Sequence, residues 1–292
     1  AAQQAALKAA VEASPADAGL QQANWSWKVV RQFMAEHLGV TLSRSSCWNY
    51  LRRLGFVWKR PKKRLLKADA AQREAFVATY ADLRQAAAQR GATIFFVDEA
   101  HFRADVEVRN KWVLRGAAAL VDSTSPRFGD KASYYSGVCL ETGAVEAMPV
   151  TQNCTAETTV AFLQQLRTKY AGPLIVIWDN GPAHRGPAIR TYLAIPDLNL
   201  RLVTLPPYSP DFNPDEAIWD WARQEVTANR CFGSAANVRQ HVDAFFAGLA
   251  TRTTEVMRRC RRELQSRADA TVASVDPASP FTQHVDLTLD SV

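Results

Sequence analysis

The sequence has no stretch of 18 apolar residues and no secretory signal pattern, so neither a membrane-spanning helix nor a membrane partner is expected. Its cysteines are odd in number and widely spaced: Cys47, Cys139, Cys154, Cys231 and Cys260. None of them forms a CxxC pair or a cluster with histidines, so no zinc motif is present. We therefore expect a protein of a reducing cytoplasm.

Acidic residues are missing from one segment, residues 51–67, although the whole chain carries a net charge of only +6. A solvated charged face is the usual interpretation of runs of mixed sign, but a dense run of one sign is more typical of a phosphate-binding segment. The segment predicts contacts with a polyanion. Its basic residues are Arg52, Arg53, Lys59, Arg60, Lys62, Lys63, Arg64 and Lys67.

The length of 292 residues, with 47% hydrophobic and 22% charged residues, is typical of a soluble protein with one large or two modest domains. The chain lacks an initiator methionine and begins partway into an Ala-rich, helix-like stretch over residues 1–13. We therefore expect that a segment upstream has been removed.

Two short helices with a glycine between them are predicted near the start. Ser26 is a candidate N-cap for the first helix, Gly39 ends it, and Ser43 caps the second. This spacing is typical of a helix-turn-helix unit, although an ordinary helical hairpin with Trp48 in its core is the alternative. The outward positions of the second helix carry side chains that can bind bases or phosphates: Arg44, Ser45, Trp48, Asn49 and Arg52.

The rest of the chain alternates between strand and helix patterns. The predicted strands are 93–97, 134–140, 144–150, 174–178 and 200–205, and the predicted helices are 69–90, 155–170, 186–194, 214–229 and 235–266. The order is that of an α/β, ribonuclease H-like mixed-sheet domain preceded by an all-α, winged-helix-like DNA-binding domain. The expected boundaries are 1–66 for the helix-turn-helix domain with its basic run, 67–91 for a connecting helix, 92–266 for the catalytic domain, and 267–292 for a polar tail.

Three acids stand at informative places in this arrangement. Asp98 and Asp179 each end an apolar run that predicts a strand buried on both faces. In a ribonuclease H-like sheet these two strands are adjacent and parallel, so both carboxylates lie at one edge. Glu216 opens the helix that follows a Pro-rich loop. We expect the three acids to form a metal site, because a buried carboxylate needs a cation.

Each acid also has a structural interpretation. Asp98 could cap a loop, and Asp179 stands in Asp-Asn-Gly-Pro, a sequence of turn formers. Glu216 could complete a capping box, which leaves Asp215 and Asp220 as competing candidates for the third ligand.

The predicted chemistry follows from the oxygen donors. Carboxylates favour Mg²⁺, with Mn²⁺ as a substitute. Two ions about 3.5–4 Å apart can activate the attacking oxygen and stabilise the leaving one at phosphorus. We expect Asp98 to bridge both ions while Asp179 and Glu216 each hold one.

Four motifs carry a resemblance to a known family. They are VDEAHF, KxWxxxG with Lys111, Trp112 and Gly116, WDNGPAH, and LPPYSPDFNPDEAIW. The chain resembles bacterial insertion-sequence transposases of the mariner-related DDE superfamily (insertion-sequence 630 family) over roughly residues 25–250. The resemblance implies a catalytic triad of Asp98, Asp179 and Glu216, the ribonuclease H-like fold, and cut-and-paste movement through terminal inverted repeats with insertion at a TA target.

The resemblance has further implications. A homodimer or larger assembly on double-stranded DNA is expected, because two element ends must be held together, and the location would be the nucleoid of a bacterial cytoplasm. His184 is expected either to contact a DNA phosphate or to make a structural hydrogen bond. Trp112 is expected to pack in the core or on a strand and not to serve as a platform for base stacking. Family members usually carry two helix-turn-helix units, whereas only the second is intact here.

Two competing functions remain open. One is a ribonuclease H-like nuclease that cuts without strand transfer. The other is a domesticated or inactive DNA-binding protein that has kept the fold.

Overall fold

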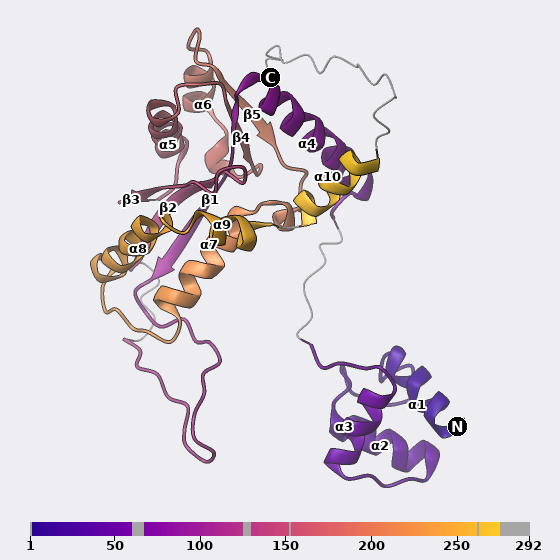
Figure 1. Ribbon diagram of the computed structural model, residues 1–292. Helices are drawn as coiled ribbons and strands as arrows, with labels where there is room; N and C mark the ends of the chain where they lie inside the picture. Colours follow the sequence, from indigo (N-terminus) through magenta and orange to yellow (C-terminus); the bar gives the residue numbers. More distant parts are fainter. Residues whose placement is uncertain (1, 60–66, 125–129, 152, 262, 275–292) are drawn as a thin grey trace. The chain divides into compact units, whose positions relative to one another are not determined.

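The computed structural model describes residues 2–59, 67–124, 130–151, 153–261 and 263–274. It divides into two compact units, residues 1–64 and 65–292 (Figure 1). The basic residues Arg60, Lys62, Lys63 and Arg64 lie outside the described residues.

In the described part of the first unit, all regular elements are helices. It comprises α1 (Ala2–Glu12), α2 (Trp27–Leu38) and α3 (Arg44–Arg53). The side chains of Ser26 and Ser43 cap α2 and α3 as predicted, and Gly39 ends α2 in the left-handed conformation, with φ of 64°. Apolar side chains from all three helices meet in one core, in which Leu7, Val30 and Cys47 are fully buried. The predicted helix pair is confirmed.

The second unit is built on a five-stranded sheet with the order β3-β2-β1-β4-β5. The strands are β1 (Thr93–Arg103), β2 (Lys131–Val138), β3 (Val145–Val150), β4 (Leu174–Trp178) and β5 (Leu200–Thr204). The first three strands are antiparallel, whereas β4 runs parallel to both β1 and β5. The predicted ribonuclease H-like sheet, with the first and fourth strands adjacent and parallel, is confirmed.

Strand β1 is longer than the predicted 93–97, because its ladder with β2 continues to the pair Arg103–Lys131. The parallel ladder with β4 ends earlier, at the pair Phe96–Ile177. Beyond that point Ala100 and Phe102 are buried on one face, while His101 and Arg103 on the other face are exposed. Asp98 therefore lies within β1 and not at its tip, at the place where β4 stops and only β2 remains as a partner.

Helices cover both faces of the sheet (Figure 1). One face packs against α5 (Ala156–Lys169) and α6 (Pro187–Leu193) through residues such as Phe95, Val97 and Phe162. The other packs against α4 (Ala70–Arg90), α7 (Asp215–Ala222), α8 (Ala235–Leu249), α9 (Thr253–Cys260) and α10 (Glu263–Ser274). A π-helical turn, Arg223–Thr227, follows α7, and two short 3-10 turns are Pro182–His184 and Pro210–Phe212.

Two elements reach further into this core than the sequence predicted. Helix α4, expected to connect two domains, buries Phe76, Val77, Tyr80, Leu83 and Ala87 in the second unit. Helix α10 continues to Ser274, although a polar tail was expected from residue 267. Salt bridges join the two helices, with Arg84 Nη1 2.6 Å from Asp269 Oδ1. The helical segment predicted over 235–266 consists of α8, α9 and the start of α10.

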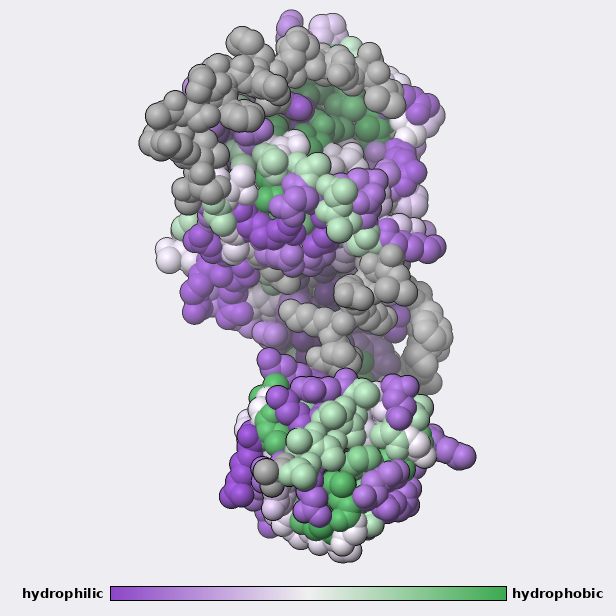
Figure 2. All heavy atoms as spheres, turned by 90° about the vertical axis from the view of Figure 1, so that its right-hand side faces the viewer, coloured by the Kyte–Doolittle hydropathy of each residue, from purple (hydrophilic) through white to green (hydrophobic). Residues whose placement is uncertain are grey.

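The surface of the second unit is mostly hydrophilic on the face shown in Figure 2. Among the described residues, no helix is long and apolar enough to cross a membrane.

Candidate active site

The parallel ladder of β1 and β4 brings two of the predicted acids to one edge of the sheet. Its last pair is Phe96–Ile177, and Asp98 and Asp179 each lie two residues beyond that pair. The negative charge of Asp179 is one of the influences that raise the pKa of Asp98. The two carboxylates are therefore neighbours in space although they are far apart in the chain.

Asp98 has a strongly perturbed acidity. Its pKa is raised from 3.8 to about 8, first because burial disfavours the charged form and then because of the negative charges of Glu216 and Glu99. A carboxyl group with such a raised pKa marks a candidate functional site. The free-energy cost of its charged form would be offset by a bound cation.

The third acid is Glu216, the second residue of α7. It is partly exposed, and its charge acts directly on Asp98. The competing candidates are placed differently. Asp215 is completely buried and accepts a hydrogen bond from Ser136, whereas Asp220 is exposed one turn further along the helix. The N-cap residue of α7 is Pro214, which makes no side-chain cap.

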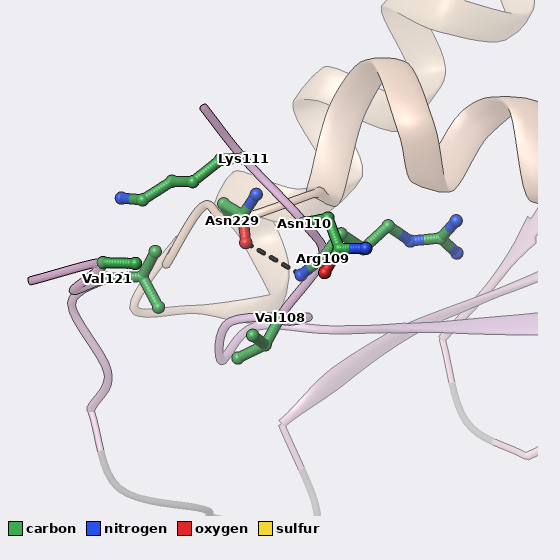
Figure 3. A pocket seen from close by; sticks show the side chains of 7 residues that line it. Val108, Arg109, Asn110, Lys111, Val121 and Asn229 are labelled. Atoms are coloured by element: carbon green, nitrogen blue, oxygen red, sulfur yellow. Dashed lines mark hydrogen bonds between the residues drawn. The ribbon is translucent and has the colours of Figure 1, made fainter. Parts of the chain in front are cut away.

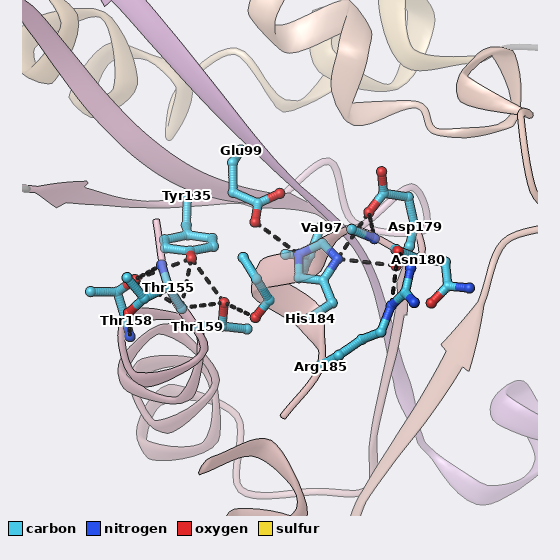
Figure 4. A network of polar contacts seen from close by, with 12 residues as sticks. Val97, Glu99, Tyr135, Thr155, Thr158, Thr159, Asp179, Asn180, His184 and Arg185 are labelled. Carbon is cyan, nitrogen blue, oxygen red and sulfur yellow. Dashed lines mark hydrogen bonds and ion pairs between the residues drawn. The ribbon is translucent and has the colours of Figure 1, made fainter. Parts of the chain in front are cut away.

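Asp179 is fixed by a polar network (Figure 4). Its Oδ1 accepts a 2.7 Å hydrogen bond from the backbone N–H of Gly181 and lies 3.0 Å from His184 Nδ1. The hydrogen bond from His184 is the main reason why the pKa of Asp179 is lowered. Both contacts use Oδ1, while the side chain as a whole is 58% exposed. The second carboxylate oxygen is therefore available at the surface for a ligand.

His184 is the centre of this network. Its side chain is only 1% exposed, its ring stacks on Trp178 with centroids 4.4 Å apart, and its Nε2 lies 3.0 Å from Glu99 Oε1. His184 and Glu99 thus form an ion pair, while His184 Nδ1 also lies 3.0 Å from the backbone carbonyl oxygen of Asp179. Burial alone would lower the pKa of His184, but the contacts with Asp179 and Glu99 raise it to about 10.

The buried position of His184 answers one question that the sequence left open. A ring with both nitrogens facing acidic groups is not placed to contact DNA, so the structure favours the structural hydrogen bond. The role of Glu99 was not predicted from the sequence. Its place directly after Asp98 was the only signal, and Glu99 faces His184 because β1 continues past Asp98 with alternating side-chain directions.

The donor set is suited to a hard cation. Asp98, Asp179 and Glu216 offer carboxylate oxygens, which Mg²⁺ and Mn²⁺ prefer, and their mutual repulsion would be relieved by positive charge. Within the described ranges no group of three or more His, Cys, Asp or Glu side chains forms a ready-made metal cage. The acids are thus placed side by side without having converged on one point.

The predicted DNA-binding side chains of the first unit lie on the outside of α3 and just after it. Arg44, Ser45, Asn49, Arg52, Arg53 and Lys59 are exposed. Trp48 is half-buried, packs edge-to-face on Trp58 with centroids 5.8 Å apart, and carries the Arg52 guanidinium over its ring. Cys47 is the buried residue of α3.

An arm formed by residues 104–124 leaves the end of β1 and is joined to the segment after α7. Asn229 Oδ1 accepts a 2.8 Å hydrogen bond from the Arg109 N–H beside a cavity of about 300 Å³ (Figure 3). The expectation that Trp112 packs in the core or on a strand is wrong, because its side chain is fully exposed, as Leu114 largely is. The sequence around Trp112 holds no local signal that this part of the chain leaves the core and exposes the Trp side chain.

Two family matches agree with this geometry. Residues 93–239 match the family described as DDE superfamily endonuclease, and residues 21–80 match the winged helix-turn-helix family. The first match covers about half of the chain and contains the sheet with Asp98, Asp179 and Glu216. The chain belongs to the DDE superfamily of endonucleases.

Solved structures of the Mos1 mariner transposase have a similar fold to this DDE superfamily chain. The Mos1 strand transfer complex is 21% identical with a TM-score of 0.64, over 93% of this chain and 77% of that chain. The Mos1 paired-end complexes with Mg and with Mn are 22% and 23% identical, with TM-scores of 0.62 and 0.61, over 93% of this chain and 78% of each. No curated protein sequence matched the chain.

Proposed function

We propose that this DDE superfamily endonuclease is a DNA transposase of the mariner-related type. Its first unit binds the terminal inverted repeats of a mobile element, and its second unit cleaves the DNA strand and transfers it. The observation that carries the proposal is the meeting of Asp98 and Asp179 on adjacent parallel strands, with the charge of Glu216 acting on Asp98.

In this proposal Asp98, Asp179 and Glu216 are the catalytic triad and hold two divalent ions, Mg²⁺ with Mn²⁺ as a substitute. The ions would supply a polarised attacking oxygen and stabilise the leaving oxygen. The chain itself orients the ligands. Asp179 is held through Oδ1 by Gly181 and His184, and Glu216 is held by the first turn of α7. The positive charge of His184, paired with Glu99, offsets part of the negative charge around Asp98.

The reaction we propose has two steps. Water attacks the phosphodiester at each element end, which breaks the bond to the 3′-oxygen and leaves a 3′-hydroxyl. That hydroxyl then attacks a phosphodiester of a TA-containing target, forms the new phosphorus–oxygen bond and releases the target's own 3′-oxygen. No oxidant or outside energy source is required, because each step exchanges one phosphorus–oxygen bond for another.

The assembly and the location belong to the same proposal. The Mos1 structures with a similar fold are named as paired-end and strand transfer complexes, which supports an assembly of at least two copies of this chain on two DNA ends. We propose that it works on the nucleoid of a bacterial cytoplasm. Membership of the insertion-sequence 630 family stays a prediction.

The exposed residues of α3, up to Arg53, and Lys59 after the helix are proposed to contact the repeat. Arg44, Ser45 and Asn49 would reach base edges or nearby phosphates, while the basic residues up to Arg64 would follow the backbone. Trp48 is half-buried against Trp58, so its part is to support the helix.

The test is cleavage and joining of a short labelled duplex that carries the inverted repeat flanking the gene of this chain. Reactions contain Mg²⁺, Mn²⁺ or EDTA, with Asp179→Asn beside the wild type. Metal-dependent nicks and joined products, both absent in the variant, establish the transposase. Nicks without joined products identify a nuclease without strand transfer. Tight binding with no chemistry identifies a DNA-binding relic.

A further inference from the structure

Two completely buried polar side chains lie beneath the candidate acids. They are Ser136 of β2 and Asp215 of α7, and the Ser136 hydroxyl donates a 2.5 Å hydrogen bond to Asp215 Oδ2. The other oxygen, Oδ1, has no hydrogen-bond partner in the described part of the chain. A buried polar atom without a partner costs about 1–3 kcal/mol. An apolar pair at these two positions would therefore give a more stable fold. The presence of the polar pair is explained by a role other than stability.

The sheet places this pair directly beside the site. Ser136 is the residue opposite Asp98 in the ladder between β1 and β2. Opposite residues in an antiparallel ladder point to the same face, with Cβ atoms about 4.5–5.5 Å apart. Ser136 therefore has Asp98 as its cross-strand neighbour and Asp215 as its hydrogen-bond partner.

A second contact attaches the same turn of α7 to β1. The Asn213 amide donates to the carbonyl oxygen of Val97 at 3.2 Å, and Asn213 Oδ1 accepts from the Asp215 backbone N–H at 3.1 Å. Val97 is the residue before Asp98, and Asn213 is buried. The start of α7 is thus held on the β1 backbone and on the β2 side chain that faces Asp98.

The two contacts fix the rotation of α7 about its axis. Successive residues of an α-helix point about 100° apart, since one turn takes about 3.6 residues. Because Asp215 points into the sheet, Glu216 points to the side, where it is partly exposed and its charge reaches Asp98. A small rotation of the helix would move the Glu216 carboxylate away from Asp98.

We propose that Ser136 and Asp215 are positioning residues that hold Glu216 where it can share a divalent cation with Asp98. The inference rests on the proposed function, because it concerns the geometry of that metal site. Asp215 acts through the helix and does not itself bind metal, since one of its oxygens is taken by Ser136 and the residue is sealed from solvent. Groups that orient metal ligands typically change metal affinity or activity by about 10–100-fold when removed.

The experiment compares Ser136→Ala, Asp215→Ala and Asp215→Asn in the full chain. Asp220→Asn is the matched control, because Asp220 is an exposed acid on the same helix. Metal affinity is obtained from the rise in melting temperature during titration with Mg²⁺ or Mn²⁺, and kcat and KM from cleavage of the repeat duplex.

Both alanine variants should lose about 10–100-fold in metal affinity and in kcat, with the KM for DNA unchanged. Asp215→Asn should stay within about threefold of the wild type, because its amide oxygen still accepts from Ser136. Asp220→Asn should match the wild type.

Two results overturn the proposal. The first is wild-type metal affinity and kcat in both alanine variants. The second is an Asp215→Asn variant as impaired as Asp215→Ala, which would show that the carboxylate itself binds metal. Ser136→Ala removes a single oxygen atom. If Asp215→Ala does not fold, the metal affinity and kcat of Ser136→Ala test the proposal. A wild-type protein without metal-dependent cleavage refutes the proposed function instead. The melting temperatures measured with Mg²⁺ or Mn²⁺ still test metal binding independently of cleavage.

Discussion

Replacing Asp98 by Asn should make the metal-free protein more stable at neutral pH, although it should abolish activity. The pKa of Asp98 in the folded protein is about 8, against 3.8 for the free side chain. Because the folded pKa is the higher one, this carboxyl costs nothing below pH 3.8. It lowers the free energy of unfolding progressively between pH 4 and pH 8, and the cost is constant above pH 8.

The magnitude follows from the two pKa values. At about 1.4 kcal/mol per pKa unit, the cost at pH 7 has an upper limit of about 4 kcal/mol. Asp98 is partly exposed, and water screens part of the repulsion from Glu216 and Glu99, so roughly half of that limit is expected. Asn has no charge at any pH, so the variant should gain roughly 2 kcal/mol over the wild type at pH 7 and nothing at pH 4.

A bound divalent ion should make the wild type more stable than Asp98→Asn. A ligand that binds only the folded state at 100 times its Kd stabilises by about 2.7 kcal/mol, and only the wild type has the carboxylate to bind it. The assay is urea unfolding of both proteins in EDTA and in Mg²⁺, at pH 4, 7 and 8.5. The reasoning is refuted if Asp98→Asn is the less stable protein in EDTA at pH 7, or if Mg²⁺ stabilises both proteins equally.

Four shorter predictions concern other parts of the chain. Gly181→Ala should reduce cleavage about 10-fold or more without changing DNA affinity, because a Cβ there would lie 2.9 Å from Asp179 Oδ1; equal cleavage would show that the carboxylate tolerates the shift. The stabilisation that His184 gives should be complete below pH 6.5 and lost as the pH rises towards 10, since its folded pKa is raised; a His184→Gln variant whose stability difference from the wild type stays constant between pH 6 and pH 10 would contradict this. Neutralising Arg53 and Lys59 together should flatten the salt dependence of duplex binding by about 0.9 in log–log slope per lost phosphate contact, and an unchanged slope would remove them from the interface. Trp112→Ser should leave the melting temperature within about 1 °C of the wild type, because the side chain is fully exposed; a large fall would mean that the arm is packed.

The local patterns of the chain predicted most elements correctly. Ser26 and Ser43 cap their helices through their own side chains, and the apolar run of β4 is buried on both faces as its composition requires. Even the meeting of Asp98 and Asp179 could be expected, because the order of elements matches the ribonuclease H-like arrangement, in which β1 and β4 are adjacent and parallel. These features depend on residues that are neighbours in the chain, or on topology rules that need no side-chain detail.

The remaining features depend on partners distant in the sequence. The sequence by itself determined that Asp98 and Asp179 meet, since each follows an apolar run that predicts a buried strand. It left Asp215, Glu216 and Asp220 open as the third acid. Only the tertiary structure decided how those acids are held: β1 continues because β2 pairs with it, which turns Glu99 toward His184 and sets Ser136 opposite Asp98. Asp215 then reaches Ser136 across 79 positions, and α10 reaches α4 through Asp269 and Arg84 across 185. No local sequence pattern predicts such contacts, because they stabilise the protein only after distant segments have packed together.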